Sequence, residues 1–328
     1  MDWPFYQDPG ATRMTDQSMN LPSCLICGRE LKPVLTQLFD DRFYTPGTYD
    51  IGRCCQCGLE QTWPQPNVRE IGEIYKRYYN CDCEKAETYT IIRRRFINSS
   101  WYRLWLKLDG DICFHLRQGK GRLLDIGCNE GRGLGFYSQN GFQPEGLEIN
   151  EKAAAVARER GFMVHTVPLE QFNPSGLFDV IVLSNVLEHA PNPLGMLKHV
   201  HRLLQPNGQV WISCPNADSL WRYRLGRHWI NWHVPFHLWH FSPRSLEAML
   251  TVTQFQIVEM QTFTPAIWIA QGLSLAMGRK LNLSNCLYRS APVITALTIT
   301  MRLLLPIIRE NRSSLSGDCL IITARASA

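Results

Sequence analysis

The sequence lacks the features of a nucleic-acid-binding, fibrous or membrane-spanning protein. Of its 328 residues only 19% are charged, the formal net charge is +5, and no run of five or six basic residues occurs. We therefore expect no nucleic-acid partner. No apolar stretch reaches about 18 residues without a charge, so no clean spanning helix is expected. The apolar fraction of 45% is ordinary for globular proteins.

We also expect no secretory signal at the start of this sequence. The first ten residues, MDWPFYQDPG, contain acids and prolines in place of a basic segment followed by an apolar one. We therefore expect a cytoplasmic protein. Twelve cysteines in a chain without such a signal favour metal ligands or buried thiols over a disulfide framework.

The chain changes character several times along its length. From Arg122 onwards strand-like and helix-like segments alternate, which predicts an α/β fold with a doubly wound sheet of seven strands. The last two strand-like segments are about fifty residues apart, so an insertion separates them. The predicted parts are a flexible tail (1–20), a cysteine-rich part (21–66), a helical connector (67–118), the sheet domain (119–262 and 317–328) and an inserted helical segment (263–316).

A glycine-containing turn, LLDIGCNEGRG, directly follows the first strand of this sheet. Gly127 and Gly131 let the backbone approach a ligand, and the helix that follows begins with free N–H groups. Glu148 ends the next strand, twenty-one residues after Gly127, where a carboxylate can accept both hydroxyls of a ribose. Together the turn, the spacing and the carboxylate predict a nucleoside-cofactor site.

These residues resemble the class I S-adenosylmethionine-dependent methyltransferases. The first motif of that family, an acidic residue followed by Gly-x-Gly-x-Gly, maps to Asp125, Gly127, Asn129 and Gly131, with Asn129 in place of the middle glycine. Asn tolerates a positive φ better than most residues, so the turn can survive. Gly131 falls two residues after Asn129 rather than three, which favours the methyl donor over NAD.

Two more segments, FDVIVLSNVLEHAPNP and LLQPNGQVWISCPN, resemble the fourth-strand and fifth-strand motifs of the same family. The resemblance implies that Gly127 and Gly131 border the methionine part of the donor, while Asp125 orders the loop and Glu148 holds the ribose. The donor-site residues that it implies are Asp125, Gly127, Asn129, Gly131, Glu148, Leu169 (for the adenine) and Asn185. An NAD(P)-dependent oxidoreductase and a non-catalytic binding module remain alternatives.

Two CxxCG knuckles precede the sheet domain, Cys24-Leu-Ile-Cys27-Gly and Cys54-Cys-Gln-Cys57-Gly. Zinc takes four soft ligands in a tetrahedron, and each knuckle turns two thiolates towards one ion. The pattern predicts a structural zinc ribbon in 21–66, held by Cys24, Cys27, Cys54 and Cys57. Cys55 is an alternative to Cys54, but the CxxC spacing favours Cys54. Such a closed site has no chemistry of its own.

This layout, two CxxC pairs followed by a helical stretch and the donor domain, resembles a group of bacterial methyltransferases of surface-polysaccharide, deoxysugar and natural-product pathways. The segment PNADSLWRYRLGRHWINWHVPFHLWHFSP shares the pattern of that group after the fifth strand. The resemblance implies methyl transfer to a sugar, glycan or small natural product, at oxygen more than at carbon. C-methylation stays open because deoxysugar C-methylating relatives share the layout.

Residues 217–241 are expected to cap the acceptor site. A hydroxyl acceptor benefits from a base with a pKa near neutrality, which histidine supplies. His189 follows the fourth strand, at the edge where such sheets bind ligands, and His237 and His240 lie in the cap. We expect His237 to be the base, with His189 or His240 in support; the alternative is that these rings only pack the cap. A metal on His233, His237 and His240 is a weaker alternative, because no carboxylate accompanies them.

The inserted segment, 263–316, contains two apolar stretches with helical spacing. In the second, Thr295, Thr298 and Arg302 fall on the face opposite an apolar stripe, so the helix should lie on a surface rather than span a bilayer. Packing on its own domain, a homodimer interface and a membrane surface are the three candidates. The last would make the protein peripheral to the inner face of a membrane.

Overall fold

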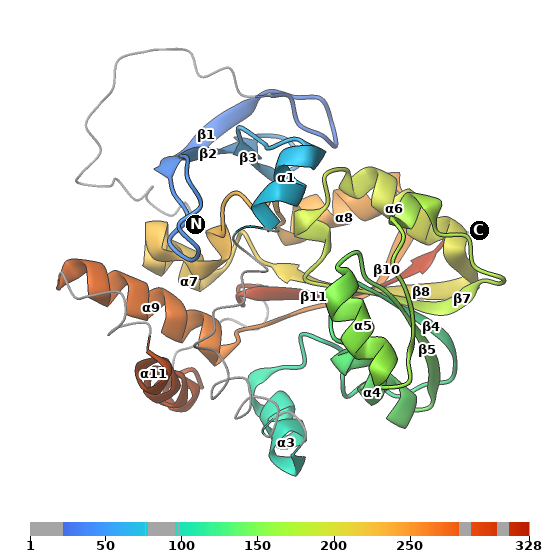
Figure 1. Ribbon diagram of the computed structural model, residues 1–328. Helices are drawn as coiled ribbons and strands as arrows, with labels where there is room; N and C mark the ends of the chain where they lie inside the picture. The colour runs from blue at the N-terminus through green and yellow to red at the C-terminus, as the bar shows by residue number, and fades with distance from the viewer. Residues whose placement is uncertain are drawn as a thin grey trace.

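The computed structural model describes residues 22–75, 77, 96, 99–281, 290–306 and 315–327. A large sheet with helices on both faces forms one part, and a smaller sheet that includes the N-terminal strands forms another (Figure 1). The predicted flexible tail, 1–20, lies outside the described residues.

The large sheet has seven strands in the order β10-β11-β8-β7-β4-β5-β6. They are β4 (Gly121–Ile126), β5 (Phe142–Leu147), β6 (Met163–His165), β7 (Phe178–Ser184), β8 (Leu204–Pro215), β10 (Phe255–Phe263) and β11 (Cys319–Ala326). Neighbours pair in parallel except β11, which runs antiparallel to β8 and β10 because the chain re-enters the sheet between them. The predicted seven-stranded, Rossmann-like α/β fold is confirmed.

Alternating side chains along the central strands bury both faces of this sheet. Leu124 and Ile181 share a core cluster with residues of α6 and α8, whereas Leu123 and Val182 share one with Tyr137 of α4. The covering helices are α4 (Arg132–Gln139), α5 (Glu151–Glu159), α6 (Pro193–Leu203) and α8 (Pro243–Val252). Each strand therefore separates two apolar layers, as a doubly wound sheet requires.

The small sheet joins the cysteine-rich part to the cap. Its antiparallel strands, in spatial order, are β1 (Leu31–Leu38), β2 (Tyr49–Cys54), β3 (Glu60–Trp63) and β9 (Trp239–His240). The last strand belongs to the cap, and it places His240 opposite Glu60 of β3. The N-terminal strands and the cap therefore form one structural unit, although they are far apart in the sequence.

Two helices are described in the predicted connector. Helix α1 (Val68–Ile74) begins with a capping box between Asn67 and Glu70, and α3 (Ser100–Asp109) ends at Gly110. Much of the chain between them lies outside the described residues.

The inserted segment contributes helices α9 (Ala266–Lys280) and α11 (Ala291–Leu304), which pack against each other. Thr298, expected on the polar face of α11, is buried. Its hydroxyl donates to the carbonyl of Ile294 at 2.7 Å, which satisfies the polar group inside the helix pair. In the described ranges, none of the helices is both long enough and apolar enough to cross a bilayer.

Candidate active site and metal centre

The glycine turn lies between β4 and α4, at the carboxyl edge of the large sheet. Gly127, Asn129 and Gly131 have φ values of 73°, 50° and 70°. A Cβ on Gly131 would lie 2.7 Å from the Cβ of Ala157, so only glycine fits this approach of α4 to α5. Gly127 and Asn129 are exposed, which leaves the backbone of the turn open to a ligand.

Glu148 connects this turn to the end of β5. Its Oε2 accepts a hydrogen bond from the backbone N–H of Asn129 at 3.0 Å, and its Oε1 accepts one from Asn150 at 2.8 Å. The side chain is half-buried. The carboxylate expected to hold a ribose therefore lies directly beside the exposed turn.

Asp125 lies beneath the turn near the end of β4, with 6% of its surface exposed. Burial, and then the negative charge of Glu148, raise the pKa of Asp125 to about 8. A Cβ atom added to Gly133 of α4 would lie 2.9 Å from Oδ2 of Asp125, so the backbone of this helix passes close to the carboxyl group. This position suits the predicted role of ordering the loop.

The two remaining donor-site candidates also follow strands of the large sheet. Leu169 starts the short 3₁₀ helix η3 (Leu169–Gln171) after β6, and its side chain is buried, so its backbone is the part that could face a nucleobase. Asn185 follows β7 with a φ of 52°, and its N–H donates to the carbonyl of Ser213 at 2.9 Å. All seven donor-site candidates thus come from segments at or after the carboxyl ends of the parallel strands.

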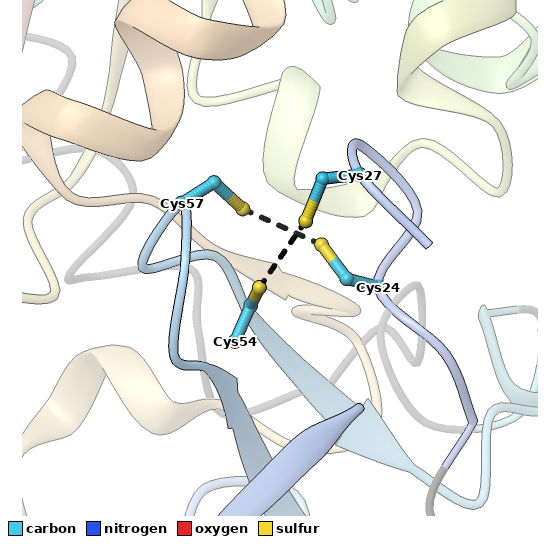
Figure 2. A group of neighbouring side chains, drawn as sticks. All are labelled: Cys24, Cys27, Cys54 and Cys57. Carbon is cyan, nitrogen blue, oxygen red and sulfur yellow. Dashed lines mark hydrogen bonds between the residues drawn. The ribbon is translucent and has the colours of Figure 1, made fainter. Parts of the chain in front are cut away.

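The four predicted zinc ligands converge on one point (Figure 2). The Sγ atoms of Cys24 and Cys57 are 3.4 Å apart, as are those of Cys27 and Cys54, and all four lie within 4.8 Å of one another. A tetrahedral zinc site with Zn–S bonds of about 2.3 Å needs sulfur atoms about 3.8 Å apart. The cluster therefore fits a zinc ion. Cys55 is exposed and does not belong to the cluster.

The backbone of both knuckles supports this arrangement. Gly28 and Gly58 have φ values of 69° and 77°, and their N–H groups donate to the carbonyls of Cys24 and Cys54. Burial raises the pKa of Cys24 and Cys57, so these thiols need a cation nearby to become thiolates. A bound zinc ion would hold all four sulfurs as ligands.

The three candidate histidines gather where the cap meets the edge of the large sheet. His189 lies on the 3₁₀ helix η4 (Leu187–His189) after β7, and its ring centroid is 4.6 Å from that of His237. The His237 and His240 centroids are 6.4 Å apart. Burial lowers the pKa of His189 to about 4 and that of His240 to about 3, and it lowers the pKa of His237 as well. All three rings are therefore neutral near pH 7.

The cysteine-rich part supports these rings through Thr62 of β3. A hydroxyl has one proton, and Thr62 donates it to the carbonyl of His237 at 2.7 Å. The Thr62 oxygen must then accept the hydrogen of His240 Nε2, 3.0 Å away. His240 is thereby fixed with its proton on Nε2, inside a fully buried contact.

Glu188 is a site residue that the sequence interpretation missed. It precedes His189 on η4, is 1% exposed, and neither of its carboxylate oxygens has a hydrogen-bond partner within the part of the chain that is described. Burial raises its pKa to about 8. The signal was a carboxyl adjacent to a candidate histidine, but only the fold brings His237 beside it.

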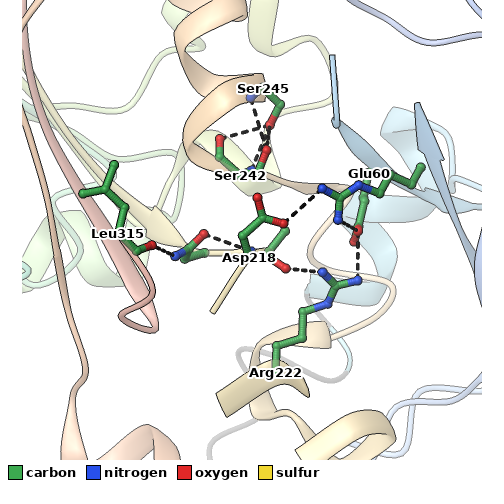
Figure 3. Close-up of polar contacts among 9 residues, drawn as sticks. Glu60, Asp218, Arg222, Ser242, Ser245 and Leu315 are labelled. Atoms are coloured by element: carbon green, nitrogen blue, oxygen red, sulfur yellow. Dashed lines mark hydrogen bonds and ion pairs between the residues drawn. The ribbon is translucent and has the colours of Figure 1, made fainter. Parts of the chain in front are cut away.

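Ion pairs connect the cap to the ribbon (Figure 3). On helix α7 (Leu220–Leu225), Arg222 contacts the buried Oε1 of Glu60 at 2.8 Å. Arg53 of β2 bridges Glu60 and Asp218 at 3.3 and 3.1 Å. The ribbon therefore fixes the start of the cap as well as its histidines.

A small, partly open hollow lies between the ribbon and the cap. Its walls are the loop 38–42, most of 227–234, and Leu275 of α9. His233 lines it, and its ring centroid is 4.8 Å from that of His237. Trp229 and Trp232 are both largely buried but also line the hollow. Its lining combines aromatic rings with Asp, Arg and His side chains.

Comparison with known proteins agrees with this geometry. A family model described as a methyltransferase domain matches residues 94–260. The ubiquinone biosynthesis O-methyltransferase of Pseudomonas aeruginosa (strain LESB58) is 36% identical over 105 residues, 30% of this chain and 45% of that protein. The enzyme of the same name from Dechloromonas aromatica (strain RCB) is 32% identical over 162 residues, 47% of this chain and 64% of that protein.

Among solved structures, that of a Burkholderia thailandensis 1,6-didemethyltoxoflavin-N1-methyltransferase with bound S-adenosylhomocysteine is similar with a TM-score of 0.46. It is 16% identical and covers 87% of this chain and 98% of its own. The chain spans about half the length of the first curated relatives it matches. The cysteine-rich part, 21–66, lies outside the matched range of the family model.

Proposed function

We propose, on the premise that this chain belongs to the methyltransferase domain family, that it transfers a methyl group from S-adenosylmethionine to a hydroxyl oxygen of a sugar, glycan or small natural product. It is a class I S-adenosylmethionine-dependent methyltransferase by family and fold, and this favours methyl transfer over the oxidoreductase alternative. The single observation that carries the proposal is the exposed turn of Gly127 and Asn129 held by Glu148.

Donor binding would use the carboxyl edge of the large sheet. The exposed backbone of Gly127 and Asn129 suits the methionine part, and the Glu148 carboxylate beside it suits two ribose hydroxyls. Asp125 would order the turn from below, and Leu169 and Asn185 would border the remaining parts of the donor. The N-terminus of α4 directly behind Gly131 adds a partial positive charge that favours the donor's carboxylate.

The reaction is an in-line displacement. The acceptor oxygen attacks the methyl carbon opposite the sulfur, the carbon–sulfur bond breaks, and S-adenosylhomocysteine leaves. The hydroxyl proton passes to His237, whose Nδ1–H donates to the carbonyl of Asn231 at 2.8 Å and so leaves Nε2 as the basic atom. His189 and His240 support that ring. The buried Glu188 carboxyl lies within 4.8 Å and would stabilise the resulting imidazolium.

The acceptor would lie against the side chains that line the hollow between ribbon and cap. Aromatic walls with interspersed polar and charged side chains suit a hydroxylated ring, because rings stack on tryptophan while hydroxyls take hydrogen bonds. The zinc ion expected at the four cysteines would hold the ribbon wall and supply no chemistry.

A phenolic or quinol-type ring is the second candidate acceptor. The observation in its favour is that the curated relatives are named ubiquinone biosynthesis O-methyltransferases. The ribbon wall of the hollow, 38–42, lies outside the range matched by the family model, so we give preference to the acceptor class suggested by the whole layout.

The exposed face of α11 could add a contact with a membrane surface or with a second copy of the chain. Leu303 is 70% exposed and Ile299 is 54% exposed on this helix. Either contact would be compatible with a cytoplasmic enzyme, and the membrane contact would bring it to a lipid-linked glycan.

The experiment is an acceptor panel with full-length protein and S-adenosylmethionine. It contains sugar nucleotides, short glycans and catechols, with S-adenosylhomocysteine release and product NMR as readouts. Methylation of a sugar oxygen supports the proposal, and methylation of a catechol favours the second candidate. A methyl group on carbon, or no transfer by protein that binds the donor, would overturn the proposed O-methylation of these acceptors.

A further inference from the structure

Three side chains outside the ribbon meet in the arrangement of a metal site. Glu188 and His189 lie on η4, and His237 comes from the cap. One ligand atom of each lies within 4.8 Å of the others. The backbone holds the two segments together, because the N–H of Leu238 donates to the carbonyl of Glu188 at 2.9 Å.

Hydrogen bonds to the backbone fix the protonation of both rings. His189 Nδ1 lies 2.9 Å from the carbonyl of Phe236 and 2.9 Å from the hydroxyl of Tyr75, which can accept from the same N–H. His237 Nδ1 lies 2.8 Å from the carbonyl of Asn231. A carbonyl only accepts, so both Nδ1 atoms carry the hydrogen and each neutral ring keeps a lone pair on Nε2. Metal-ligating histidines typically donate their other N–H in this way, which orients the ring.

The third group, Glu188, receives no hydrogen bond at its carboxyl from another described residue. Both of its oxygens are buried and have no hydrogen-bond partner among the described residues. Nδ1 of His233 lies 3.4 Å from His237 Nε2, at the long end of the hydrogen-bond range. The Glu188 carboxyl and one ring nitrogen of each histidine therefore lie within 4.8 Å of one another. A cation between them would compensate the charge of the carboxylate once it loses its proton.

We propose that Glu188, His189 and His237 bind a divalent transition-metal ion through one carboxylate oxygen and the two Nε2 atoms. Two imidazoles and one carboxylate are a common ligand set for zinc, iron and related ions, and three protein ligands leave coordination positions open. His240 stays outside the ligand set, because the ligand atoms that lie within 4.8 Å of one another here belong to Glu188, His189 and His237.

The open positions give the ion a use in the proposed function. An acceptor hydroxyl bound there would have a lower pKa and would release its proton to solvent water, and His237 would then serve as a metal ligand in place of the proton acceptor. This use rests on the proposed function, whereas the binding itself does not. A hydrogen bond from protonated Glu188 to a neighbouring ring is the metal-free alternative.

Metal content is the first test. Full-length protein is equilibrated with Zn²⁺, desalted and analysed for zinc per chain, together with Glu188→Gln, His189→Gln and the control Glu247→Gln, whose carboxyl is exposed on α8. We expect about two zinc ions in the wild type and the control, and about one in the two site variants. Equal zinc content in wild type and both folded site variants would overturn the inference. Circular dichroism identifies a site variant that fails to fold. In that case the zinc content of the other, folded site variant tests the inference.

Cobalt distinguishes the two centres. Co²⁺ added to protein that carries one zinc ion in the ribbon should give weak visible absorption without a sulfur charge-transfer band, and Glu188→Gln should remove this absorption. Absorption that persists in Glu188→Gln would contradict the assignment. Both readouts are independent of donor binding, so failure of the methyltransferase proposal would leave this result interpretable.

Discussion

The hydroxyl of Thr62 donates a hydrogen bond to the carbonyl of His237 at 2.7 Å and accepts one from His240 Nε2 at 3.0 Å. This residue belongs to β3, in the part of the chain that carries the four cysteines, and the two histidines belong to the cap. The histidine cluster is therefore held from outside the large sheet. Disturbing the ribbon should affect the acceptor side of the site more than the donor side.

Thr62→Val tests this contact directly. The variant leaves the His240 N–H buried without a partner, at a cost of about 1–3 kcal/mol in the free energy of unfolding. We expect kcat to fall by about tenfold or more while the Kd for S-adenosylmethionine stays the same. Thr62→Ser should restore most of the activity, and Thr251→Val, on the exposed side of α8, should change neither quantity. If Thr62→Val lost affinity for S-adenosylmethionine by as large a factor as it lost kcat, the ribbon would not act mainly on the acceptor side.

Loss of a zinc ligand should have a similar but larger effect. In Cys57→Ser the second knuckle loses a zinc ligand, and strand β3 follows this knuckle directly. The first knuckle also contacts β3, because the N–H of Leu25 donates to the side chain of Gln61. We expect a lower melting temperature and a strong loss of turnover. Cys55→Ser is the matched control, because this exposed cysteine lies outside the cluster. Thermal melts and zinc analysis of both variants check this, and an unchanged zinc content in Cys57→Ser would refute the ligand assignment.

His237→Gln tests the proton acceptor. The substitution keeps a polar side chain of similar size but removes the basic nitrogen, so kcat should fall by about 10²–10⁴. The affinity for S-adenosylmethionine should not change, since His237 is not among the donor-site candidates. His199→Gln, on α6, should behave as the wild type. If His237→Gln retained full turnover, the base would have to be another group.

The raised pKa of Asp125 predicts that the free energy of unfolding depends on pH. Its pKa is about 8 in the folded protein, above its ordinary value, mainly because of burial. Between about pH 4 and 8 the folded protein therefore binds more protons at this carboxyl than the unfolded chain does, so its contribution to stability falls as pH rises. Asp125→Asn lacks this dependence. Melting temperatures from pH 5 to 8 should decline more steeply in the wild type than in the variant; parallel curves would contradict the raised pKa.

The sequence contains enough information for the sheet domain and little for the cap. The apolar strands and the helices between them have local signals, as the buried run of β7 illustrates. The pairing of β3 with β9 involves a strand of two residues, Trp239 and His240, that is too short to produce a periodic pattern. Glu188 escaped notice for the same reason, because its proximity to His237 depends on a long-range contact. The expectation for Thr298 failed because a hydroxyl can satisfy itself within its own helix.

The most direct test of the account is calorimetric titration of the full-length protein with S-adenosylmethionine and S-adenosylhomocysteine, beside Glu148→Ala. The account predicts micromolar binding of both ligands to the wild type. It also predicts that the substitution weakens binding at least tenfold, about 1.4 kcal/mol, because the carboxylate that holds the turn and faces the ribose is lost. Absence of binding by folded, zinc-loaded wild type would contradict the central claim.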